Sequence, residues 1–244
     1  DGTKTYFAEG ISIVISAVEH GAPVRYIIYS PELLRSEAAY NVISSVMGHI
    51  TCYEAGPGFF SQISSRDNPV GIGAVLDYHE ASTNELEPVE RKVFVAADSI
   101  KNPGNLGSII RTADCLGLAG VLISGKSTDQ FHPECVKATM GGLYTVPITR
   151  FEAPEEVLIW CESRNVQVLT TSSKAKNDIA DFSGYPRPLT VMLGSEGLGL
   201  EGSVLESGRF QVRIPMRGSV TSLNLAVAAG ILMYDVVSKP SILT

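Results

Sequence analysis

From residue 92 onward, short apolar runs of strand length alternate with longer segments that repeat apolar residues at helical spacing. The apolar runs cover residues 93–97, 121–124, 166–170, 189–193 and 210–214, and the helical segments cover residues 106–116, 133–140, 154–164 and 223–237. Alternation of this kind predicts an α/β fold, in which a parallel sheet is covered by helices on both faces. Ligands bind such sheets beyond the carboxyl ends of the strands, so we expect a site in the loops that follow the apolar runs.

A polar stretch over residues 78–91 separates this region from a differently built first part of the chain. In that first part, residues 11–18 and 31–46 have helical patterns, whereas residues 25–29 and 70–76 are strand candidates. The order of these segments predicts a small α/β domain over residues 1–77, a linker over 78–91 and a larger domain over 92–244.

Composition excludes several classes of protein. Hydrophobic residues make up 44% of the chain and charged residues 18%, which is typical of a globular rather than a disordered protein. No apolar run reaches the roughly 18 residues of a membrane-spanning helix, and the polar start does not resemble a signal peptide. The four cysteines and four histidines form no CxxC pair or ligand cluster, so we expect free thiols, a cytoplasmic location and no metal.

The first candidate loop, residues 102–111, follows the run 93–97. Pro103 and Gly104 form a tight-turn dipeptide, and Asn105 is the expected N-cap of the next helix. Arg111 lies about two turns into that helix, with its side chain directed toward the N-terminus. A polar pocket lined by Asn105 and Arg111 suits an anionic or ribose-bearing substrate, although a capped helix with one surface arginine explains the same residues.

The second candidate loop, residues 194–199, contains three glycines after the run 189–193, which let backbone approach a ligand closely. The spacing matches neither a dinucleotide fingerprint nor a Walker loop. Glu196 is in a position to orient a substrate or to brace the loop. A simple Gly-rich turn between strand and helix is the alternative.

The third candidate loop, residues 215–224, follows the run 210–214. Ser222 is the expected N-cap of a helix with an apolar stripe at Leu223, Val227, Ile231 and Tyr234. Asn224 is a poor choice inside a helix, so we expect its amide to act at the start of the helix. Met216 would pack on a flat apolar group such as adenine, or else in the core.

Three segments carry a resemblance to a known family: NPGNLGSIIRTADCLG, LTVMLGSEGLGL and RIPMRGSVTSLNLAVAAGIL. They resemble the signature motifs of the SpoU (TrmH) family of RNA 2′-O-ribose methyltransferases, in the SPOUT superfamily, and the match is colinear through residues 92–238. The first 77 residues resemble the family's L30e-like substrate-binding domain, on the segments Phe7-x-Glu9-Gly10 and Asn68-Pro69-Val70-Gly71-Ile72.

The resemblance implies a SPOUT-type parallel sheet with a C-terminal trefoil knot, preceded by the small L30e-like α/β domain. It also implies a homodimer that transfers a methyl group from S-adenosylmethionine to a ribose 2′-hydroxyl of rRNA or tRNA. Residues 1–80 hold four basic and nine acidic residues, a net −5, against −7 for the whole chain. So acidic a first domain favours a structured rRNA element that is recognised by shape.

By the same resemblance, Arg111 matches the family's catalytic arginine and Asn105 the asparagine beside it. Glu196 matches the glutamate of the second motif, and Ser222 and Asn224 match the polar pair of the third. The cofactor would contact Thr170, Thr171, Gly194, Ile214, Met216, Ser222 and Leu223. Two roles for Arg111 stay open: a general base toward the ribose hydroxyl, or a cation that stabilises the developing alkoxide.

Two other functions compete with this interpretation. A dehydrogenase would need the dinucleotide fingerprint that the chain lacks. A non-catalytic RNA-binding ribosome assembly factor would not need the polar set at Asn105, Arg111, Glu196, Ser222 and Asn224, and would not bind S-adenosylmethionine. Antibiotic resistance, rRNA maturation and tRNA modification all remain open as roles.

Overall fold

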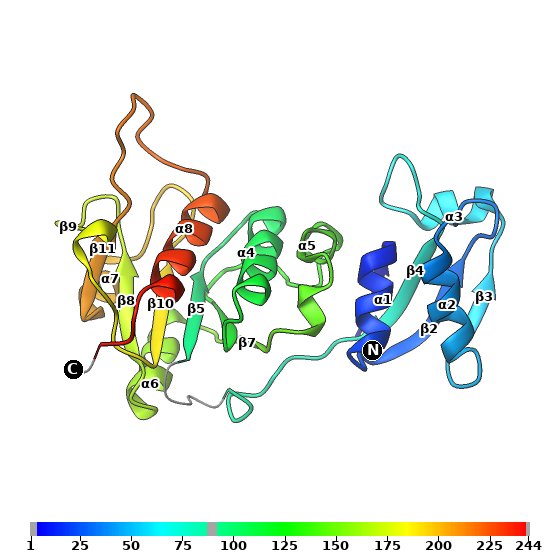
Figure 1. Ribbon diagram of the computed structural model, residues 1–244, viewed down its shortest axis with the longest axis horizontal. Helices are drawn as coiled ribbons and strands as arrows, with labels where there is room; N and C mark the ends of the chain where they lie inside the picture. Colours follow the sequence, from blue (N-terminus) through cyan, green and yellow to red (C-terminus); the bar gives the residue numbers. More distant parts are fainter. Residues whose placement is uncertain (1–3, 87–91, 243–244) are drawn as a thin grey trace.

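Two separate sheets organise the chain in the computed structural model, which describes residues 4–86 and 92–242 (Figure 1). The first has four strands in the order β1-β4-β2-β3, and the second has seven in the order β7-β6-β5-β10-β8-β11-β9. All neighbouring strands of the second sheet pair in parallel. The α/β fold with a parallel sheet and a small N-terminal domain is therefore confirmed.

The small domain alternates strands and helices. Its elements are β1 (Thr5–Glu9), α1 (Ile11–Glu19), β2 (Val24–Tyr29), α2 (Glu37–Val46), β3 (Thr51–Glu54), α3 (Pro57–Ile63) and β4 (Ile72–Asp77). The helix expected over residues 31–46 begins only at Glu37, because Ser36 caps it by accepting a hydrogen bond from the Ala39 N–H. The short elements β1, β3 and α3 were not predicted.

The larger domain contains every strand and helix that the sequence predicts. Its elements are β5 (Val93–Asp98), α4 (Pro103–Cys115), β6 (Gly120–Ser124), α5 (Pro133–Thr139), η1 (Gly142–Tyr144), β7 (Ile148–Arg150), α6 (Pro154–Ser163), β8 (Gln167–Thr171), β9 (Asn177–Asp178), η2 (Ile179–Asp181), β10 (Leu189–Leu193), α7 (Gly202–Ser207), β11 (Phe210–Arg213) and α8 (Leu225–Ser238). The additional strands β7 and β9 lie at the two edges of the sheet and have three and two residues, too few for an alternation pattern.

Both helix caps in the functional loops differ from the prediction. Asn102, rather than Asn105, caps α4, and its side chain accepts a hydrogen bond of 3.0 Å from the Asn105 N–H. Pro103 takes the first helical position, where a missing N–H costs nothing, so the cap must precede it. Asn224, rather than Ser222, caps α8, and its Oδ1 accepts hydrogen bonds from the N–H groups of Ala226 and Val227.

The central strands of the larger sheet are buried on both faces. Along β5, Val93, Val95 and Ala97 join the core under α4 and α8, whereas Phe94 and Ala96 join the core under α6 and α7. Successive strand residues point to opposite faces, so a continuous apolar run is what a doubly covered sheet requires. This packing holds the carboxyl ends of the strands at one edge (Figure 1).

The two domains share a packed junction. Phe131 and Val136, from the segment around α5, belong to the core of the small domain. The Tyr6 ring lies 4.7 Å from the Phe131 ring, and the Ser16 hydroxyl donates a 3.1 Å hydrogen bond to the Gly141 carbonyl.

Of the expected segments, residues 87–91 of the linker, 1–3 of the first domain and 243–244 of the second lie outside the described residues. Within the described ranges, no helix is both long enough and apolar enough to cross a membrane.

Gly107 offers a test of the contact between α4 and α5. A Cβ at this position would lie 2.4 Å from the Cys135 carbonyl oxygen. Alanine improves helix propensity by about 1 kcal/mol, but overpacking costs about 1–3 kcal/mol, and here the neighbour is backbone. We expect Gly107→Ala to lower the free energy of unfolding by about 1–2 kcal/mol, measured by urea denaturation.

The matched control is Gly230→Ala in α8, where the nearest atom to a new Cβ lies 3.9 Å away. This substitution should stabilise the protein by up to about 1 kcal/mol through helix propensity alone. Equal effects of the two substitutions would contradict the close packing of α4 on α5.

Candidate functional site

The three loops singled out in the sequence meet at the carboxyl edge of the larger sheet. Strand β10 pairs with β5 on one side and with β8 on the other, and β8 pairs with β11. The loops after β5 and β10 therefore emerge from adjacent strands, and the loop after β11 emerges from a strand separated from β10 only by β8. The loop between β11 and α8 projects beyond this edge (Figure 1).

A chain of side-chain hydrogen bonds joins the three loops. The Asn105 Nδ2 donates to Glu196 Oε1 at 2.9 Å, and the Asn224 Nδ2 donates to Asn105 Oδ1 at 3.0 Å. Glu196 Oε2 accepts a further bond of 3.2 Å from the backbone N–H of Lys101. Asn105 thus uses its amide N–H toward one loop and its carbonyl toward the other. Three of the five predicted catalytic residues are brought together in this way.

The carboxylate of Glu196 is held in its ionised form. Burial alone would raise the pKa of Glu196. Hydrogen bonds from the Asn105 side chain and from the backbone N–H groups of Glu196, Lys101 and Asn102 outweigh burial, and the pKa is lower than usual for a glutamate. A carboxylate with such engaged oxygens is suited to bracing the loops rather than to accepting a proton.

The other two predicted catalytic residues lie outside this chain. Arg111 is exposed on α4, beside Gly142, and in the part of the chain that the structure describes its side chain makes no hydrogen bond or ion pair. Its guanidinium is therefore available to a ligand. Ser222 is exposed in the loop before α8, and its side chain lines a cavity between the second and third loops.

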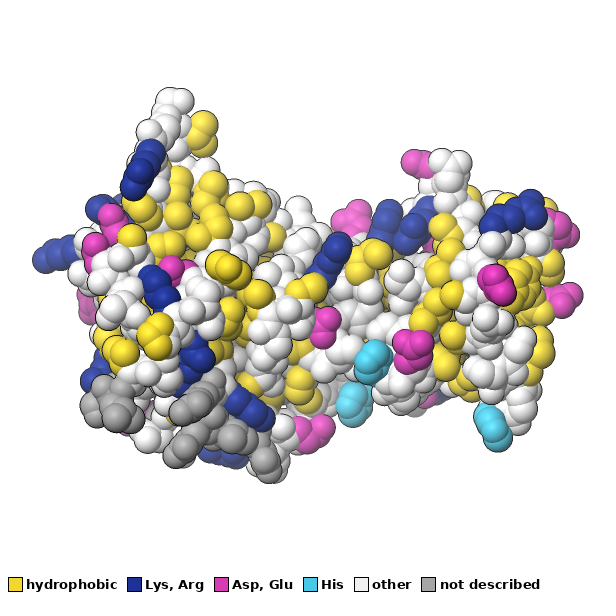
Figure 2. Space-filling model, viewed as in Figure 1, with side chains coloured by type: hydrophobic (Ala, Val, Ile, Leu, Met, Phe, Trp, Pro, Cys, Tyr) yellow, Lys and Arg dark blue, Asp and Glu magenta, His cyan; other side chains and the backbone are white. Residues whose placement is uncertain are grey.

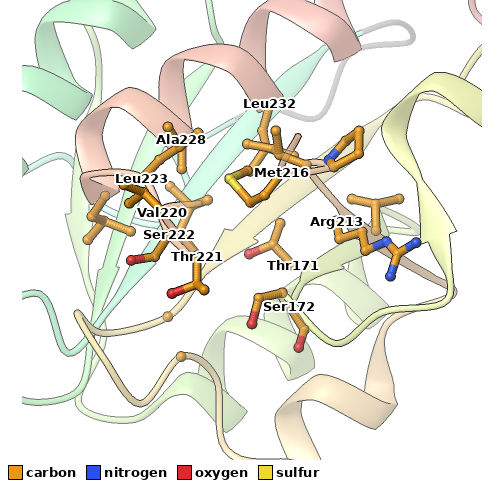
Figure 3. Close-up of a pocket in the computed structure, with 18 of the residues that line it drawn as sticks. Thr171, Ser172, Arg213, Met216, Val220, Thr221, Ser222, Leu223, Ala228 and Leu232 are labelled. Atoms are coloured by element: carbon orange, nitrogen blue, oxygen red, sulfur yellow. The ribbon is translucent and has the colours of Figure 1, made fainter. Parts of the chain in front are cut away.

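This cavity has a volume of about 590 Å³ and an apolar and a polar side (Figure 3). Figure 3 shows the Met216 sulfur and the hydroxyls of Thr171 and Ser222 around it. Of the seven residues predicted to contact the cofactor, six line the cavity: Thr171, Gly194, Ile214, Met216, Ser222 and Leu223. The seventh, Thr170, does not line it, because its buried hydroxyl donates to the Leu205 carbonyl at 2.9 Å.

Several lining residues were not predicted. Ser172 and Ser173 follow β8 directly, and Leu225, Ala228 and Leu232 belong to one face of α8. The position of the two serines after an apolar run is the signal that would have identified them. Arg213 also lines the cavity, but its guanidinium pairs with Asp178 and points away from the centre in Figure 3.

The second loop folds back on itself at Gly194. Ser195 and Gly199 exchange backbone hydrogen bonds of 3.2 and 3.0 Å. A Cβ on Gly194 would lie 2.1 Å from the Gly199 carbonyl carbon, so no other residue fits without displacing the loop. The exposed backbone around this turn, together with the hydroxyls of Thr171 and Ser222, suits a ligand with a polar part and a flat apolar part.

Residues 4–86 and 92–242 contain no group of three or more His, Cys, Asp or Glu side chains placed to hold a metal ion.

Comparisons with known proteins agree on the family. Residues 92–234 match the model of the SpoU rRNA Methylase family, and residues 1–74 match the MRM3-like substrate binding domain. The chain is 29% identical over 240 residues to the 23S rRNA (uridine(2479)-2′-O)-methyltransferase of Streptomyces viridochromogenes, covering 96% of this chain and 83% of the relative. It is 28% identical to the 23S rRNA (guanosine(2553)-2′-O)-methyltransferase RlmP of Bacillus subtilis, covering 95% and 88%.

A solved structure with bound cofactor is also similar. The AdoMet-bound rRNA methyltransferase from Sinorhizobium meliloti superposes with a TM-score of 0.85 at 31% identity, covering 96% of this chain and 87% of that one.

The lowered pKa of Glu196 predicts how stability changes with pH. A carboxyl whose pKa is lower in the folded protein stabilises it above the unfolded value of about 4.3, and this contribution is lost as the pH falls through the folded pKa. Glu196→Gln should therefore be less stable than the wild type at pH 7, and the difference should shrink below about pH 4. Urea midpoints at both pH values measure this.

Glu206→Gln is the control, because Glu206 is exposed on α7 and its side chain makes no hydrogen bond within the described residues. Its difference from the wild type should stay near zero at both pH values. A Glu196→Gln difference that is constant or grows toward acid would contradict the assigned role of the carboxylate.

Proposed function

The chain belongs to the SpoU rRNA Methylase family, and from that premise we propose how its residues act on ribosomal RNA. The protein is an S-adenosylmethionine-dependent methyltransferase that modifies a ribose 2′-hydroxyl. Ribosomal RNA is the favoured substrate, because both relatives described above are named for 23S rRNA. The observation that carries the proposal is the link from Asn105 to Glu196 and Asn224 beside the 590 Å³ cavity.

The cavity between the second and third loops is the proposed cofactor site. Met216 and Leu223 offer an apolar surface to the adenine, while Thr171, Ser222 and the backbone at Gly194 offer polar groups to the ribose and amino acid parts. When bound, S-adenosylmethionine supplies a methyl group activated by its sulfonium. Thr170 supports this site only indirectly, because its hydroxyl hydrogen-bonds the Leu205 carbonyl and so attaches α7 to β8.

Arg111 is proposed as the catalytic cation. Arginine side chains keep their proton in proteins, so a positive guanidinium near the ribose stabilises the developing alkoxide while the hydroxyl proton passes to water. Asn105, Glu196 and Asn224 hold the loops that present the cofactor and the ribose to each other. Ser222 is exposed at the mouth of the cavity, where its hydroxyl orients the ribose.

We also propose the trefoil knot and the L30e-like small domain that the resemblance implies. After α8 the chain runs beside residues 184–187: the Tyr185 N–H donates to the Pro240 carbonyl, and the Ile242 N–H donates to the Tyr185 carbonyl. Arg187 adds a hydrogen bond to the Lys239 carbonyl. Such tight docking of the C-terminal segment supports a knotted path. The match to a substrate-binding domain over residues 1–74 supports the RNA-binding role of the small domain.

A homodimer is proposed on the exposed face of α8. Val227, Ile231 and Tyr234 are 51%, 38% and 63% exposed, whereas Leu223, the fourth residue of the predicted stripe, precedes the helix and lines the cavity. Figure 2 shows hydrophobic side chains gathered over this helix. The sequence predicted the stripe, but the core is contacted by the opposite face, at Ala229 and Met233. A contiguous apolar surface of this kind marks a protein interface, here with a second copy.

The proposed location of the protein is the cytoplasm. Its four cysteines are free thiols, as expected in a reducing compartment, and rRNA is found there.

The role of Arg111 is tested by substitution. Arg111→Ala should lower kcat/KM for methylation of 23S rRNA by about 100-fold or more, because the stabilisation of the alkoxide is lost. Arg111→Lys keeps the charge and should retain part of the activity. The Kd for S-adenosylmethionine should not change in either variant, since Arg111 does not line the cavity. Labelled methyl transfer and calorimetric titration measure the two quantities.

Arg164→Ala, at the end of α6, removes a half-buried arginine that donates to Asn84 and contacts none of the three loops, and it serves as the control. Wild-type methylation by Arg111→Ala would rule out the catalytic role.

The dimer proposal is tested at Val227. Val227→Glu places a charge on the exposed face of α8 and should convert the protein to a monomer in analytical ultracentrifugation without loss of fold. Ile159→Glu is the matched control, because Ile159 is 64% exposed on α6. If Val227→Glu sediments as the wild type does, α8 is not the dimer interface.

A further inference from the structure

We propose that a groove between β1 and α5 binds one unpaired nucleotide of the RNA substrate, with its base stacked on Tyr78 and its phosphate near Lys137. The inference rests on the proposed function, because it deepens how that RNA is recognised. The groove has a volume of about 330 Å³ and is separate from the cofactor cavity. It lies at the junction of the two domains.

The groove is formed by side chains from one face of β1 and from α5. Thr5, Phe7 and Glu9 alternate along β1 and line one wall, while Pro133 and Lys137 line the other. Strand β1 is an edge strand that pairs only with β4 among the described strands. The register fixes the two ends of the groove, because Thr5 lies opposite Asp77 and Glu9 lies opposite Gly73.

The end near Thr5 is aromatic. The Tyr78 ring stacks on the Phe131 ring with centroids 4.3 Å apart and an angle of 30° between planes. Tyr6 packs against both rings, 4.7 Å from Phe131 and edge-on to Tyr78 at 5.8 Å, so three rings from both domains form one cluster. Tyr78 is the most exposed of the three, at 39%. An exposed ring held by such a cluster suits an unstacked base, and base stacking contributes about 1–3 kcal/mol per base.

The rest of the groove lining includes polar residues and a cation. The Glu9 carboxylate is 6% exposed, and its oxygens accept hydrogen bonds from the Ser64 hydroxyl and the Ser65 N–H. Arg66 lies 3.9 Å from the same carboxylate. The negative charge of Glu9 is therefore already compensated. Lys137 is exposed and makes no ion pair within the ranges 4–86 and 92–242, which leaves its ammonium available to a phosphate.

The charge of the small domain favours base stacking over phosphate contacts. With four basic and nine acidic residues over positions 1–80, that domain repels an RNA backbone. Two of its four cations are also occupied, since Arg25 pairs with Asp77 and Arg66 with Glu9. The groove can bind RNA despite this repulsion, because its aromatic surface is neutral and its cation comes from the larger domain. Figure 2 shows Lys and Arg side chains between the two domains on the face that it presents.

The groove also explains two sequence features that the cofactor site does not use. Phe7 and Glu9 belong to the segment Phe7-x-Glu9-Gly10 of the first domain, and Tyr78 is the first residue of the expected linker. All three line the groove. The Tyr78 hydroxyl adds a polar group at its rim, and burial followed by the nearby Asp129 raises the pKa of Tyr78, so the phenol remains protonated at neutral pH.

The test measures methylation kinetics of the full chain on a 23S rRNA transcript. Tyr78→Ala should raise KM for RNA by about 10-fold, with kcat and the KM for S-adenosylmethionine changed less than about 2-fold. Tyr78→Phe keeps the ring and should behave as the wild type. Lys137→Gln should raise KM for RNA and reduce the slope of log KM against log salt by about one, while Lys137→Arg should preserve both.

Tyr53→Ala is the matched control, because Tyr53 is 54% exposed on β3 at the opposite edge of the small sheet. Its KM for RNA should equal that of the wild type. Wild-type KM values in both Tyr78→Ala and Lys137→Gln would overturn the nucleotide site while leaving the methyltransferase intact. Absence of methylation by the wild-type protein would instead overturn the proposed rRNA substrate and the groove together.

Removal of the Tyr78 ring can unfold the junction, because the ring packs on Phe131. A second measurement therefore uses the wild-type protein and the same transcript containing 4-thiouridine. Photocrosslinking should join RNA to the peptides that contain Tyr78 or Phe131, as read by mass spectrometry. Crosslinks to the small domain that never include these two peptides would overturn the proposal.

Discussion

The hydrogen bonds of the Asn105 side chain unite loops that lie about 90 and 120 residues apart in sequence, with separations of 91 to Glu196 and 119 to Asn224. They exist only because β5 and β10 are neighbours in the sheet and because α4 and α8 begin at the same edge. The ionised carboxylate of Glu196 strengthens one of them, since hydrogen bonds to charged groups exceed those between neutral groups. The cavity proposed for the cofactor and the exposed Arg111 both lie beside helices whose starts this chain of bonds holds together.

Much of the larger domain follows from the sequence because its strands are buried on both faces and are therefore continuous apolar runs. The prediction was less accurate where a side chain's partner is distant in sequence. Asn105 and Asn224 were both assigned to helix starts, but which asparagine caps and which bridges depends on loops that only the fold brings together. Thr170 and Thr171 are adjacent, yet one faces α7 and the other the cavity. The periodicity of α8 revealed an apolar stripe but not that it faces outward.

The small domain was harder to predict for a physical reason. Its sheet is short, its edge strands β1 and β3 have five and four residues, and part of its core is contributed by Phe131 and Val136 of the other domain. When part of a domain's core comes from residues 50 or more positions away, the apolar pattern of the domain's own segment is incomplete. The shared core also means that the small domain is held against α5 by buried apolar area rather than by the linker alone. The orientation of the small domain relative to the larger one is thus fixed by packing.

Helix α8 has three faces with three different environments. Leu225, Ala228 and Leu232 line the cavity proposed for the cofactor, Ala229, Met233 and Val236 enter the core, and Val227, Ile231 and Tyr234 are exposed. A rotation of the helix about its axis would disturb all three surfaces at once. The proposed cofactor site and the proposed dimer face therefore share one rigid body. By thermodynamic reciprocity, any tightening of the proposed dimer that a ligand of the cavity causes must be matched by an equal gain in the affinity for that ligand on assembly.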